Sequence, residues 1–506
     1  MSRSIARRWW RWAGAAVLLG VVVGMSIRSG ASNAAETYDL VIANGRVMDP
    51  ESGLDAVRNV GIRGGKIAAV SSGPLEAKQT IDAKGLVVAP GFIDLHEHGQ
   101  EPRNYQFQAH DGVTTSLELE GGTADVDRWY DAREGKSLIN YGVSIGHIPV
   151  RRNILTKTNG ERGLGGKVSA AEMAAEDAAA HRAATPAEIV QIKEAMERGF
   201  RSGALAEGMG VNYTPGASHW EIVEAFRVAA KYGASVHVHL RHAGGKEPET
   251  GLSALEEVIA AAVTTGAPLH VVHITSMGLK YTPQLIAMVE GAQKRGLDVT
   301  TECYPYTAGS TYLQSSIFDP GWQETLEISF HDVQWADTGE RLTAETFEKY
   351  RKQGGIVVIH SIPEEAARIA VSNPMIMIAS DGMPITGAKV HPRGQGTFSR
   401  VLGHYVREEK ALDLMAALRK MTLMPAQRLE KRAPMFKDKG RIRVGADADI
   451  TVFDATRVID KATYENPLQY SEGIQFVLVN GVPVVKDGQL IDGVFPGRAA
   501  RAPISQ

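Results

Sequence analysis

The sequence predicts an α/β fold in which a TIM-type (β/α)8 barrel carries a small β-sandwich built from both chain ends. Three observations lead to this prediction. Short apolar runs separated by hairpin turns occupy residues 36–88, and the same pattern returns over residues 436–506. Between them, over residues 89–435, apolar strands alternate with amphipathic helical stretches. Repeated strand–helix units over about 350 residues are typical of a barrel of parallel strands.

The first 35 residues differ from the rest of the chain. Four arginines precede an apolar run at 13–25, and small residues follow before the first acidic residue, Glu36. This order is typical of an export signal. The apolar run is shorter than the roughly 18 residues that a membrane span needs. We therefore expect residues 1–35 to be an export signal or an N-terminal anchor. The mature protein would then be periplasmic or secreted, or held at the inner membrane.

The two chain ends share one pattern of short strands and tight turns. Residues 36–88 contain apolar runs at 38–42, 60–62 and 67–70, with turns at Asn44-Gly45 and Gly64-Gly65. Residues 436–506 contain runs at 450–453 and 477–479, with turns at Asn480-Gly481 and Asp487-Gly488. Asn-Gly and Gly-Gly between apolar runs are hairpin signals. We expect both ends to close one β-sandwich outside the barrel.

The middle of the chain supplies the barrel strands. They are predicted to begin near Ile93, Thr115, Val143, Gly203, Ser235, Leu269, Val299 and Met375, with a further strand at 356–360 before the last. Thr185-Pro186-Ala-Glu188 predicts a capped helix start, because Thr and Glu three apart form a capping box and Pro suits the first helical position. The stretch 311–355, rich in charges, interrupts the rhythm and is predicted to be a lid or a plain surface excursion.

The composition limits the classes of function. A net charge of -3 offers no basic field for a nucleic acid. The chain has one cysteine, Cys303, so an internal disulfide is impossible and thiolate metal sites are nearly excluded. Any metal ion would therefore be held by His, Asp and Glu side chains.

Such side chains gather at the predicted strand ends, where barrels carry their chemistry. Because side chains alternate along a strand, His96 and His98 share one face of the first strand. Neutral imidazole is the commonest metal ligand, so this pair could hold one ion. The other strand-end candidates are Glu118, Glu120, His239, Arg241, His273 and Asp381. His270 and His273 have odd spacing, so only one of them is expected to face the barrel axis.

The motifs around these residues resemble the amidohydrolase superfamily, and within it the N-acyl-D-amino-acid deacylases, from about residue 38 to residue 498. Pro-Gly-Phe-Ile-Asp-Leu-His96-Glu-His98 is similar to the first-strand motif of the superfamily. Four further segments resemble the deacylase subgroup: Gly210-Val-Asn-Tyr-Thr-Pro-Gly216, Tyr304-Pro-Tyr-Thr-Ala-Gly-Ser310-Thr, Ser380-Asp381-Gly, and His391-Pro-Arg393 with Gly-Thr-Phe398. Pro496-Gly-Arg498 adds to them.

The resemblance implies a role for individual residues. His96 and His98 would bind one metal ion, and His239 and His273 would bind a second. Asp381 would be both a ligand and the catalytic proton shuttle. Residues at the positions that hold the substrate carboxylate in this family are Tyr304, Ser310 and Arg393.

The chain departs from the family pattern at two places. The deacylases have a bridging cysteine near the end of the second strand, where this chain has Leu119-Glu120-Gly, so Glu120 is expected to bridge. Glu118 and Glu207 are the alternatives. Thr275 stands where the family pattern has a lysine that helps to bind the substrate carboxylate. The resemblance therefore defines the substrate less closely than the class of reaction.

We therefore expect a hydrolase that uses one or two Zn²⁺ ions and cleaves a linear amide, an N-acyl (D-)amino acid. Arg241 and Arg393 are candidates for a bidentate grip on the substrate carboxylate, and a salt bridge is the alternative for Arg241. The other function classes are a cyclic-amide hydrolase or dipeptidase of the same superfamily, and a non-catalytic scaffold. The expected partner is a small molecule, with no nucleic acid and no membrane contact beyond the N-terminal segment.

Overall fold

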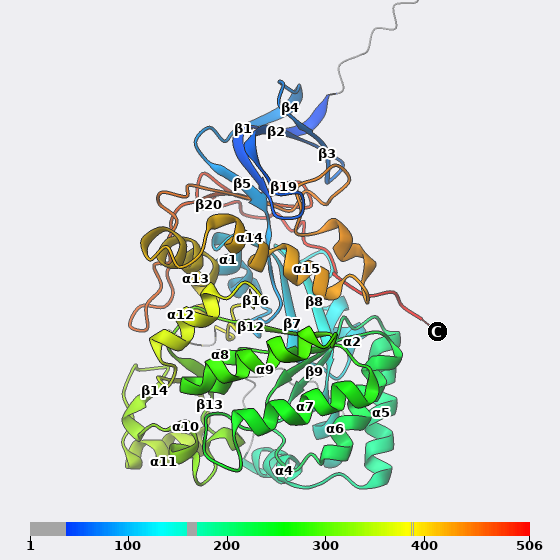
Figure 1. Ribbon diagram of the computed structural model, residues 1–506, viewed down its shortest axis with the longest axis vertical. Helices are drawn as coiled ribbons and strands as arrows, with labels where there is room; N and C mark the ends of the chain where they lie inside the picture. The colour runs from blue at the N-terminus through cyan, green and yellow to red at the C-terminus, as the bar shows by residue number, and fades with distance from the viewer. Residues whose placement is uncertain (1–36, 159–169, 386, 388, 506) are drawn as a thin grey trace, which may run out of the picture. The chain divides into compact units, whose positions relative to one another are not determined.

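A computed structural model describes residues 37–158, 170–385, 387 and 389–505 of the protein (Figure 1). The predicted export signal or anchor at residues 1–35 lies outside the described residues, so it stays a prediction. Within the described ranges, no helix has the length and apolar character needed to cross a bilayer.

Eight parallel strands form a nearly closed barrel, which confirms the predicted fold class. They are β6 (Phe92–Asp94), β7 (Val113–Thr123), β8 (Asn140–Gly146), β9 (Glu207–Gly210), β10 (Val236–His239), β11 (Leu269–Val271), β12 (Val299–Cys303) and β16 (Ile376–Ile378). Each lies at one of the eight positions predicted from the sequence. Beyond their ends, the N–H of Asp381 donates to the carbonyl of His96 at 2.7 Å, and the N–H of His98 donates to the carbonyl of Gly382 at 2.8 Å. These bonds join the first strand to the last.

Helices follow the strands and cover the barrel (Figure 1). They are α1 (Pro102–His110), α2 (Val126–Asp131), α3 (His147–Thr156), α4 (Ala170–His181), α5 (Pro186–Arg201), α6 (His219–Lys231), α7 (Gly251–Thr265), α8 (Ile274–Gly278), α9 (Thr282–Lys294), α12 (Glu364–Ser372), α13 (Arg393–Arg400), α14 (Leu414–Met421) and α15 (Leu423–Leu429). Helix α5 begins with the predicted capping box between Thr185 and Glu188. Its apolar stripe, which includes Ile192 and Phe200, is buried.

The two chain ends form one mixed sheet, as their matching patterns predicted. Its order is β20-β19-β18-β17-β5-β1-β2-β3, and β4 pairs with β1. The strands are β1 (Tyr38–Asp49), β2 (Leu54–Arg63), β3 (Lys66–Ser71), β4 (Ala77–Asp82), β5 (Val87–Pro90), β17 (Ile450–Phe453), β18 (Ile474–Val479), β19 (Val482–Lys486) and β20 (Gln489–Leu490). The ends join where β17 pairs antiparallel with β5. A core that includes Ile42, Val60 and Ile450 fills the space between them.

The predicted lid segment forms a small unit of its own. Antiparallel strands β13 (Gly309–Tyr312), β14 (Val333–Trp335) and β15 (Ile356–Ile359) make a three-stranded sheet, with α10 (Trp322–Leu326) and α11 (Ala344–Gln353) beside it. The strand predicted at 356–360 is therefore β15, which pairs with β13 and β14 and not with the barrel. Trp322 stacks on Phe347 with ring centroids 5.2 Å apart, which gives the unit an apolar core. Movement of this segment as a lid remains a prediction.

A buried ion cluster joins the mixed sheet to the barrel. The ammonium of Lys439, whose side chain is 2% exposed, lies 2.9 Å from a carboxylate oxygen of Asp447 and 2.7 Å from one of Asp449. Asp449 also accepts hydrogen bonds from the side chain of Asn140, at the start of β8, and from the N–H of Asn480. Because the buried charges are paired and hydrogen-bonded, their desolvation is offset.

We expect Lys439→Met to lower the free energy of unfolding by about 3 kcal/mol, because it leaves the buried carboxylate of Asp449 without its cation. Lys66 is a matched control, since it also contacts Asp447 but is 45% exposed. Lys66→Met should cost less than about 1 kcal/mol. Urea denaturation of both variants would measure the two changes in the free energy of unfolding. Equal changes would contradict the view that the buried ion cluster stabilises the contact between the mixed sheet and the barrel.

Candidate metal-dependent active site

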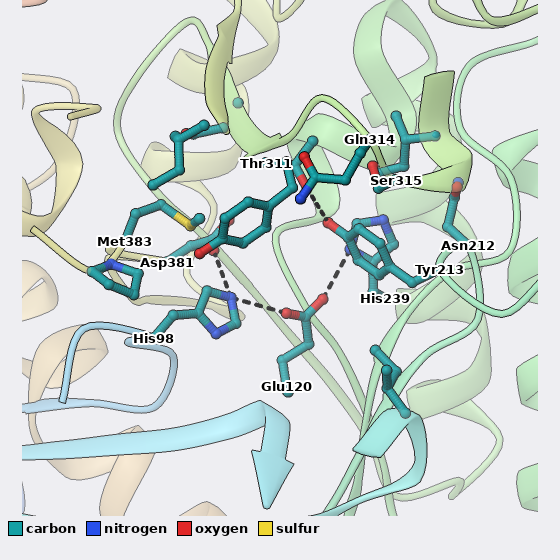
Figure 2. A pocket seen from close by; sticks show the side chains of 18 of the residues that line it. His98, Glu120, Asn212, Tyr213, His239, Thr311, Gln314, Ser315, Asp381 and Met383 are labelled. Atoms are coloured by element: carbon teal, nitrogen blue, oxygen red, sulfur yellow. Dashed lines mark hydrogen bonds and ion pairs between the residues drawn. The ribbon is translucent and has the colours of Figure 1, made fainter. Parts of the chain in front are cut away.

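A cavity of about 1230 Å³ opens where the barrel strands end. Its lining includes His98, Glu120, His239, His273 and Asp381, which come from five different barrel strands or their ends. Figure 2 shows four of them, His98, Glu120, His239 and Asp381. The sequence predicted this meeting point, because the carboxyl ends of parallel barrel strands share one mouth.

Glu120, on β7, lies between two pairs of imidazoles. One carboxylate oxygen is 3.2 Å from Nε2 of His96 and 3.1 Å from Nε2 of His98. The other oxygen is 2.9 Å from Nδ1 of His239 and 3.6 Å from Nε2 of His273. A carboxylate shared in this way is suited to bridge two ions or to complete one site on either side.

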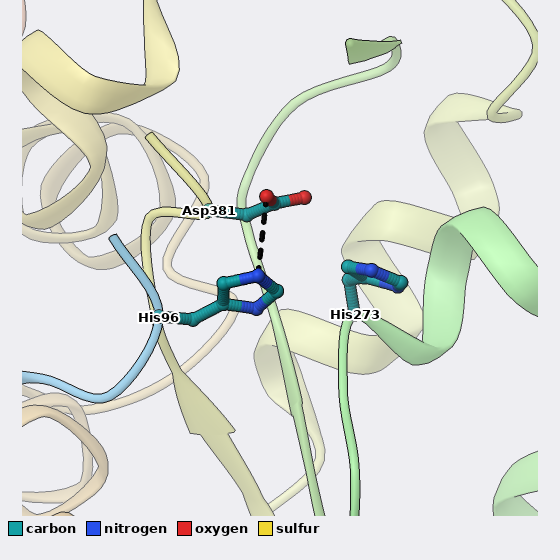
Figure 3. A group of neighbouring side chains, drawn as sticks. All are labelled: His96, His273 and Asp381. Carbon is teal, nitrogen blue, oxygen red and sulfur yellow. Dashed lines mark ion pairs between the residues drawn. The ribbon is translucent and has the colours of Figure 1, made fainter. Parts of the chain in front are cut away.

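Asp381 approaches the same centre from the end of β16. Its Oδ1 lies 3.3 Å from Nε2 of His96 and 3.4 Å from Nε2 of His98. Figure 3 shows His96, His273 and Asp381 as one group. Oδ2 of Asp381 is 2.8 Å from Nη1 of Arg393, so the guanidinium fixes the side of the carboxylate that faces away from the imidazoles.

Outer hydrogen bonds orient the imidazoles. Nδ1 of His96 lies 2.7 Å from Glu302, on β12, and Nδ1 of His98 lies 2.6 Å from Glu118. These contacts direct Nε2 of each ring toward the centre. Such partners commonly fix the tautomer and raise the basicity of metal-binding histidines.

Two residues of the site have strained backbones. His273 has φ 31° and Asp381 has φ 51°, which is the left-handed region that favours glycine. Strained conformations of this kind cost about 1–3 kcal/mol each and cluster at functional sites. Here the strain turns both side chains into the mouth directly after their strands end.

The charges of the site alter its pKa values. Burial raises the pKa of Glu120, but hydrogen bonds from the four imidazoles, that of His239 first, outweigh it and hold the pKa well below its usual range. Burial also raises the pKa of Asp381, and the Arg393 guanidinium and neighbouring imidazoles lower it to about 2. Burial lowers the pKa of His96, but the carboxylates around it, that of Asp381 first, hold it well above its usual range. The carboxylates therefore favour positive charge at the centre.

The donor set fits a divalent metal ion. Ligand atoms lie within 4.8 Å of one another in three buried groups, namely His96 with His273 and Asp381, His96 with His98 and Glu120, and Glu120 with His239 and His273. Nε2 of His239 is buried without a hydrogen-bond partner among the described residues, as expected of a free ligand atom. Nitrogen and oxygen donors of this kind suit Zn²⁺.

The structure distinguishes the three carboxylates considered for bridging. Glu120 contacts all four imidazoles, whereas Glu118 contacts His98 from outside the centre and accepts the N–H of Gly121. Glu207 is fully buried, and neither of its carboxylate oxygens has a hydrogen-bond partner in the described part of the chain. The geometry therefore favours Glu120.

The candidate substrate residues Tyr304, Ser310 and Arg393 all line the cavity. The guanidinium of Arg393 lies 4.6 Å from the centre of the Tyr304 ring, and its Nη2 donates to the carbonyl of Ser310 at 3.2 Å. Nε of Arg393 is buried without a partner in the structure described. This leaves one charged donor for an anionic group.

The prediction that Arg241 grips a substrate is corrected by the structure. Its guanidinium binds both carboxylate oxygens of Glu257, at 2.9 and 2.7 Å, and Arg241 does not appear among the described residues that line the cavity. The alternative of a salt bridge is therefore the one observed. Arg241 follows β10, and Glu257 lies on α7, the helix of the same barrel unit. Strand alternation alone does not reveal that a strand-end arginine pairs with the following helix.

The expectation that only one of His270 and His273 faces the barrel axis is also wrong. Strand β11 ends at Val271, and the left-handed backbone of His273 turns its ring inward. His270 also faces the interior, where Nε2 lies 3.1 Å from Glu302. The alternation of side chains predicts the direction of His270, which lies on β11, but not that of His273, which lies beyond the end of the strand.

Sequence reasoning missed Glu302, which links His96 to His270. It is an acidic residue near the end of a barrel strand, a signal that Glu118 and Glu120 share. Tyr312 was also missed, because a tyrosine in a loop-rich segment carries no such signal.

Comparison with known proteins gives three findings. The chain matches the amidohydrolase family over residues 79–142 and 152–485. A D-aminoacylase and an N-acyl-D-glutamate deacylase, both of Alcaligenes xylosoxydans xylosoxydans, are 29% and 30% identical over 92% of this chain, and over 98% and 97% of their own lengths. The crystal structure of an N-acyl-D-glutamate deacylase from Bordetella bronchiseptica, complexed with zinc and a phosphonate inhibitor, is 27% identical with a TM-score of 0.76 and covers 92% of this chain and 100% of its own.

We expect Glu120→Gln to fold normally but to retain less zinc, because the amide removes the negative charge that the four imidazoles share. Glu207→Gln is a matched control, since Glu207 is equally buried but has no contact with an imidazole. Elemental analysis after dialysis would compare both variants with the wild type. Full zinc content in Glu120→Gln, together with a loss in Glu207→Gln, would move the bridging role to Glu207.

Proposed function

The chain belongs to the amidohydrolase family, and from this premise we propose that it hydrolyses N-acyl-D-amino acids to a free amino acid and a carboxylate. The reaction class follows from the family and from the buried His, Glu and Asp groups that fit a metal ion. Two relatives at 29% and 30% identity act, by their names, on N-acylated D-amino acids, which supports this substrate class.

One observation carries the proposal. Glu120 brings four imidazoles to one point, and Asp381 lies 3.3 Å from the nearest of them with Arg393 on its other oxygen. The arrangement places a proton acceptor beside a cation site in a cavity large enough for a small acylated amino acid.

The metal ligands that we propose are His96, His98, Glu120, His239, His273 and Asp381. Bound zinc would polarise the amide carbonyl and lower the pKa of a water molecule toward about 7. Zinc also accompanies the related deacylase from Bordetella bronchiseptica in its crystal structure.

Asp381 is the proposed proton shuttle. Its pKa of about 2 keeps the carboxylate ionised at neutral pH, so it can accept the proton of the attacking water. The same oxygen can then pass that proton to the leaving nitrogen. Arg393, held 2.8 Å from Oδ2, leaves Oδ1 as the oxygen that faces the reacting groups.

The α-carboxylate of the substrate would bind at the far side of Asp381. Nε of Arg393 is a buried donor without a partner among the described residues, and Tyr304 and Ser310 border the same part of the cavity. A guanidinium fixed by an aromatic face and a backbone carbonyl is preorganised for a planar carboxylate.

A substrate screen tests the proposal. We expect zinc-loaded protein to release amino acid from N-acetyl-D-methionine, N-acetyl-D-leucine or N-acetyl-D-glutamate faster than from the L-enantiomers. A chelator should abolish this turnover, and added Zn²⁺ should restore it, because the carbonyl and the water depend on the ion. A ninhydrin assay of released amine would follow the reaction. Turnover of dihydroorotate or a hydantoin, with none of the acylated amino acids, would favour the cyclic-amide alternative.

We expect Asp381→Asn to keep its fold and lose turnover by about 10²- to 10⁴-fold, because the amide cannot accept the proton of the attacking water. Asp319→Asn is the control, since Asp319 pairs with Arg351 outside the metal centre. The kcat of both variants would be measured on the best substrate of the screen, with circular dichroism to check folding. Unchanged kcat in Asp381→Asn would refute the shuttle.

A further inference from the structure

Three tyrosines line the cavity, and their hydroxyl groups differ in their partners. Tyr213 Oη is 3.0 Å from Oγ1 of Thr311. The ring of Tyr304 lies under the guanidinium of Arg393. Tyr312 Oη is buried and has no hydrogen-bond partner within the described residues. Burying a hydroxyl without a partner costs free energy, so an unpaired phenol at a cavity wall suggests that a bound molecule supplies the missing partner.

The position of Tyr312 is fixed relative to the metal centre. Nη2 of Arg393 donates to the carbonyl of Ser310 on β13, and Nη1 of the same guanidinium binds Asp381. Strand β13 is thereby held beside the metal centre. Tyr312 follows two residues later on this strand, so its side chain lies on the same face as that of Ser310.

The surroundings of Tyr312 keep its phenol neutral. Burial raises the pKa of Tyr312 to about 12, and the imidazole of His98 opposes this rise. The phenol is therefore protonated at neutral pH. A neutral phenol is a hydrogen-bond donor that needs no change of charge to act.

We propose that Tyr312 is a catalytic residue whose Oη–H donates a hydrogen bond to the oxygen of the scissile amide carbonyl. This inference rests on the proposed function. When water adds to the carbonyl carbon, the π electron pair of the C=O bond moves to that oxygen, and Tyr312 stabilises the resulting charge without giving up its proton. The C–N bond then breaks, and the nitrogen takes the proton that Asp381 carried from the water.

The donor is suited to this role because it is positioned before the substrate binds. A preorganised donor aimed at a developing oxyanion needs no reorganisation during the reaction, and removing one such donor costs about 10²- to 10³-fold in kcat. Tyr312 sits on a sheet that Ser310 Oγ also fixes, through a hydrogen bond of 2.8 Å to the carbonyl of Val357 on β15.

Tyr312→Phe removes only the hydroxyl and tests the proposal. We expect kcat on the best substrate of the screen to fall by about 10²-fold with KM changed less than about threefold, because the lost bond acts on the transition state. Zinc content should match the wild type. Tyr350→Phe is the matched control, since its hydroxyl donates to Glu340 in the same small unit, away from the cavity lining described. Unchanged kcat, or loss of zinc, in Tyr312→Phe would overturn the proposal.

A binding measurement separates this inference from the proposed substrate. Acetohydroxamate presents an amide-like carbonyl oxygen to a zinc site and needs no amino-acid side chain. We expect Tyr312→Phe to weaken its binding to zinc-loaded protein by at least about tenfold in calorimetry, with Tyr350→Phe unchanged. If no acylated amino acid is turned over but this loss occurs, the proposed substrate is wrong and Tyr312 stands. If both phenylalanine variants bind acetohydroxamate like the wild type, the role of Tyr312 is refuted.

Discussion

The structure of the mouth depends on one interaction, the sharing of the Glu120 carboxylate by four imidazoles. Its side chain is 4% exposed, and an ionised carboxylate at such a position is costly unless positive charge or hydrogen bonds surround it. Imidazoles from three strand ends supply these contacts, with the two oxygens serving different pairs. An alkyl group at the same place would leave ring nitrogens buried without a common acceptor. The barrel therefore places a buried anion where a cation can compensate its charge.

That interaction is possible only because the barrel closes between β6 and β16. Asp94 contributes to the closure, since its Oδ1 accepts the N–H groups of both His96 and Ser380. The backbone hydrogen bond from the N–H of Asp381 to the carbonyl of His96 also joins the two strand ends. The left-handed conformations of His273 and Asp381 are the local cost of ending strands abruptly and turning the next side chain inward. Stability elsewhere in the barrel holds these two residues in place, which is typical of a site built on a rigid scaffold.

Much of this architecture could be predicted from residue order. The eight barrel strands, the shared sheet of the chain ends and the meeting of His96, His98, Glu120 and Asp381 all follow from periodicity and strand ends. Side-chain pairing between a strand end and the following helix could not be predicted in the same way. Arg241, after β10, binds Glu257 on α7, and a separation of 16 residues does not show which face of the helix meets the strand end. The small sheet that contains β15 escaped prediction because a short apolar run carries no signal of which sheet it joins.

The outer contacts show that the two halves of the centre are not equivalent. Carboxylates accept from Nδ1 of His96 and of His98, whereas the hydroxyl of Ser276 lies 2.9 Å from Nδ1 of His273. His239 is reversed, with Nδ1 on the shared Glu120 carboxylate. A carboxylate behind an imidazole raises its basicity and fixes its tautomer more strongly than a hydroxyl does. Carboxylates therefore orient the rings of His96 and His98, whereas a hydroxyl orients the ring of His273, and each half of the centre faces a different oxygen of Glu120.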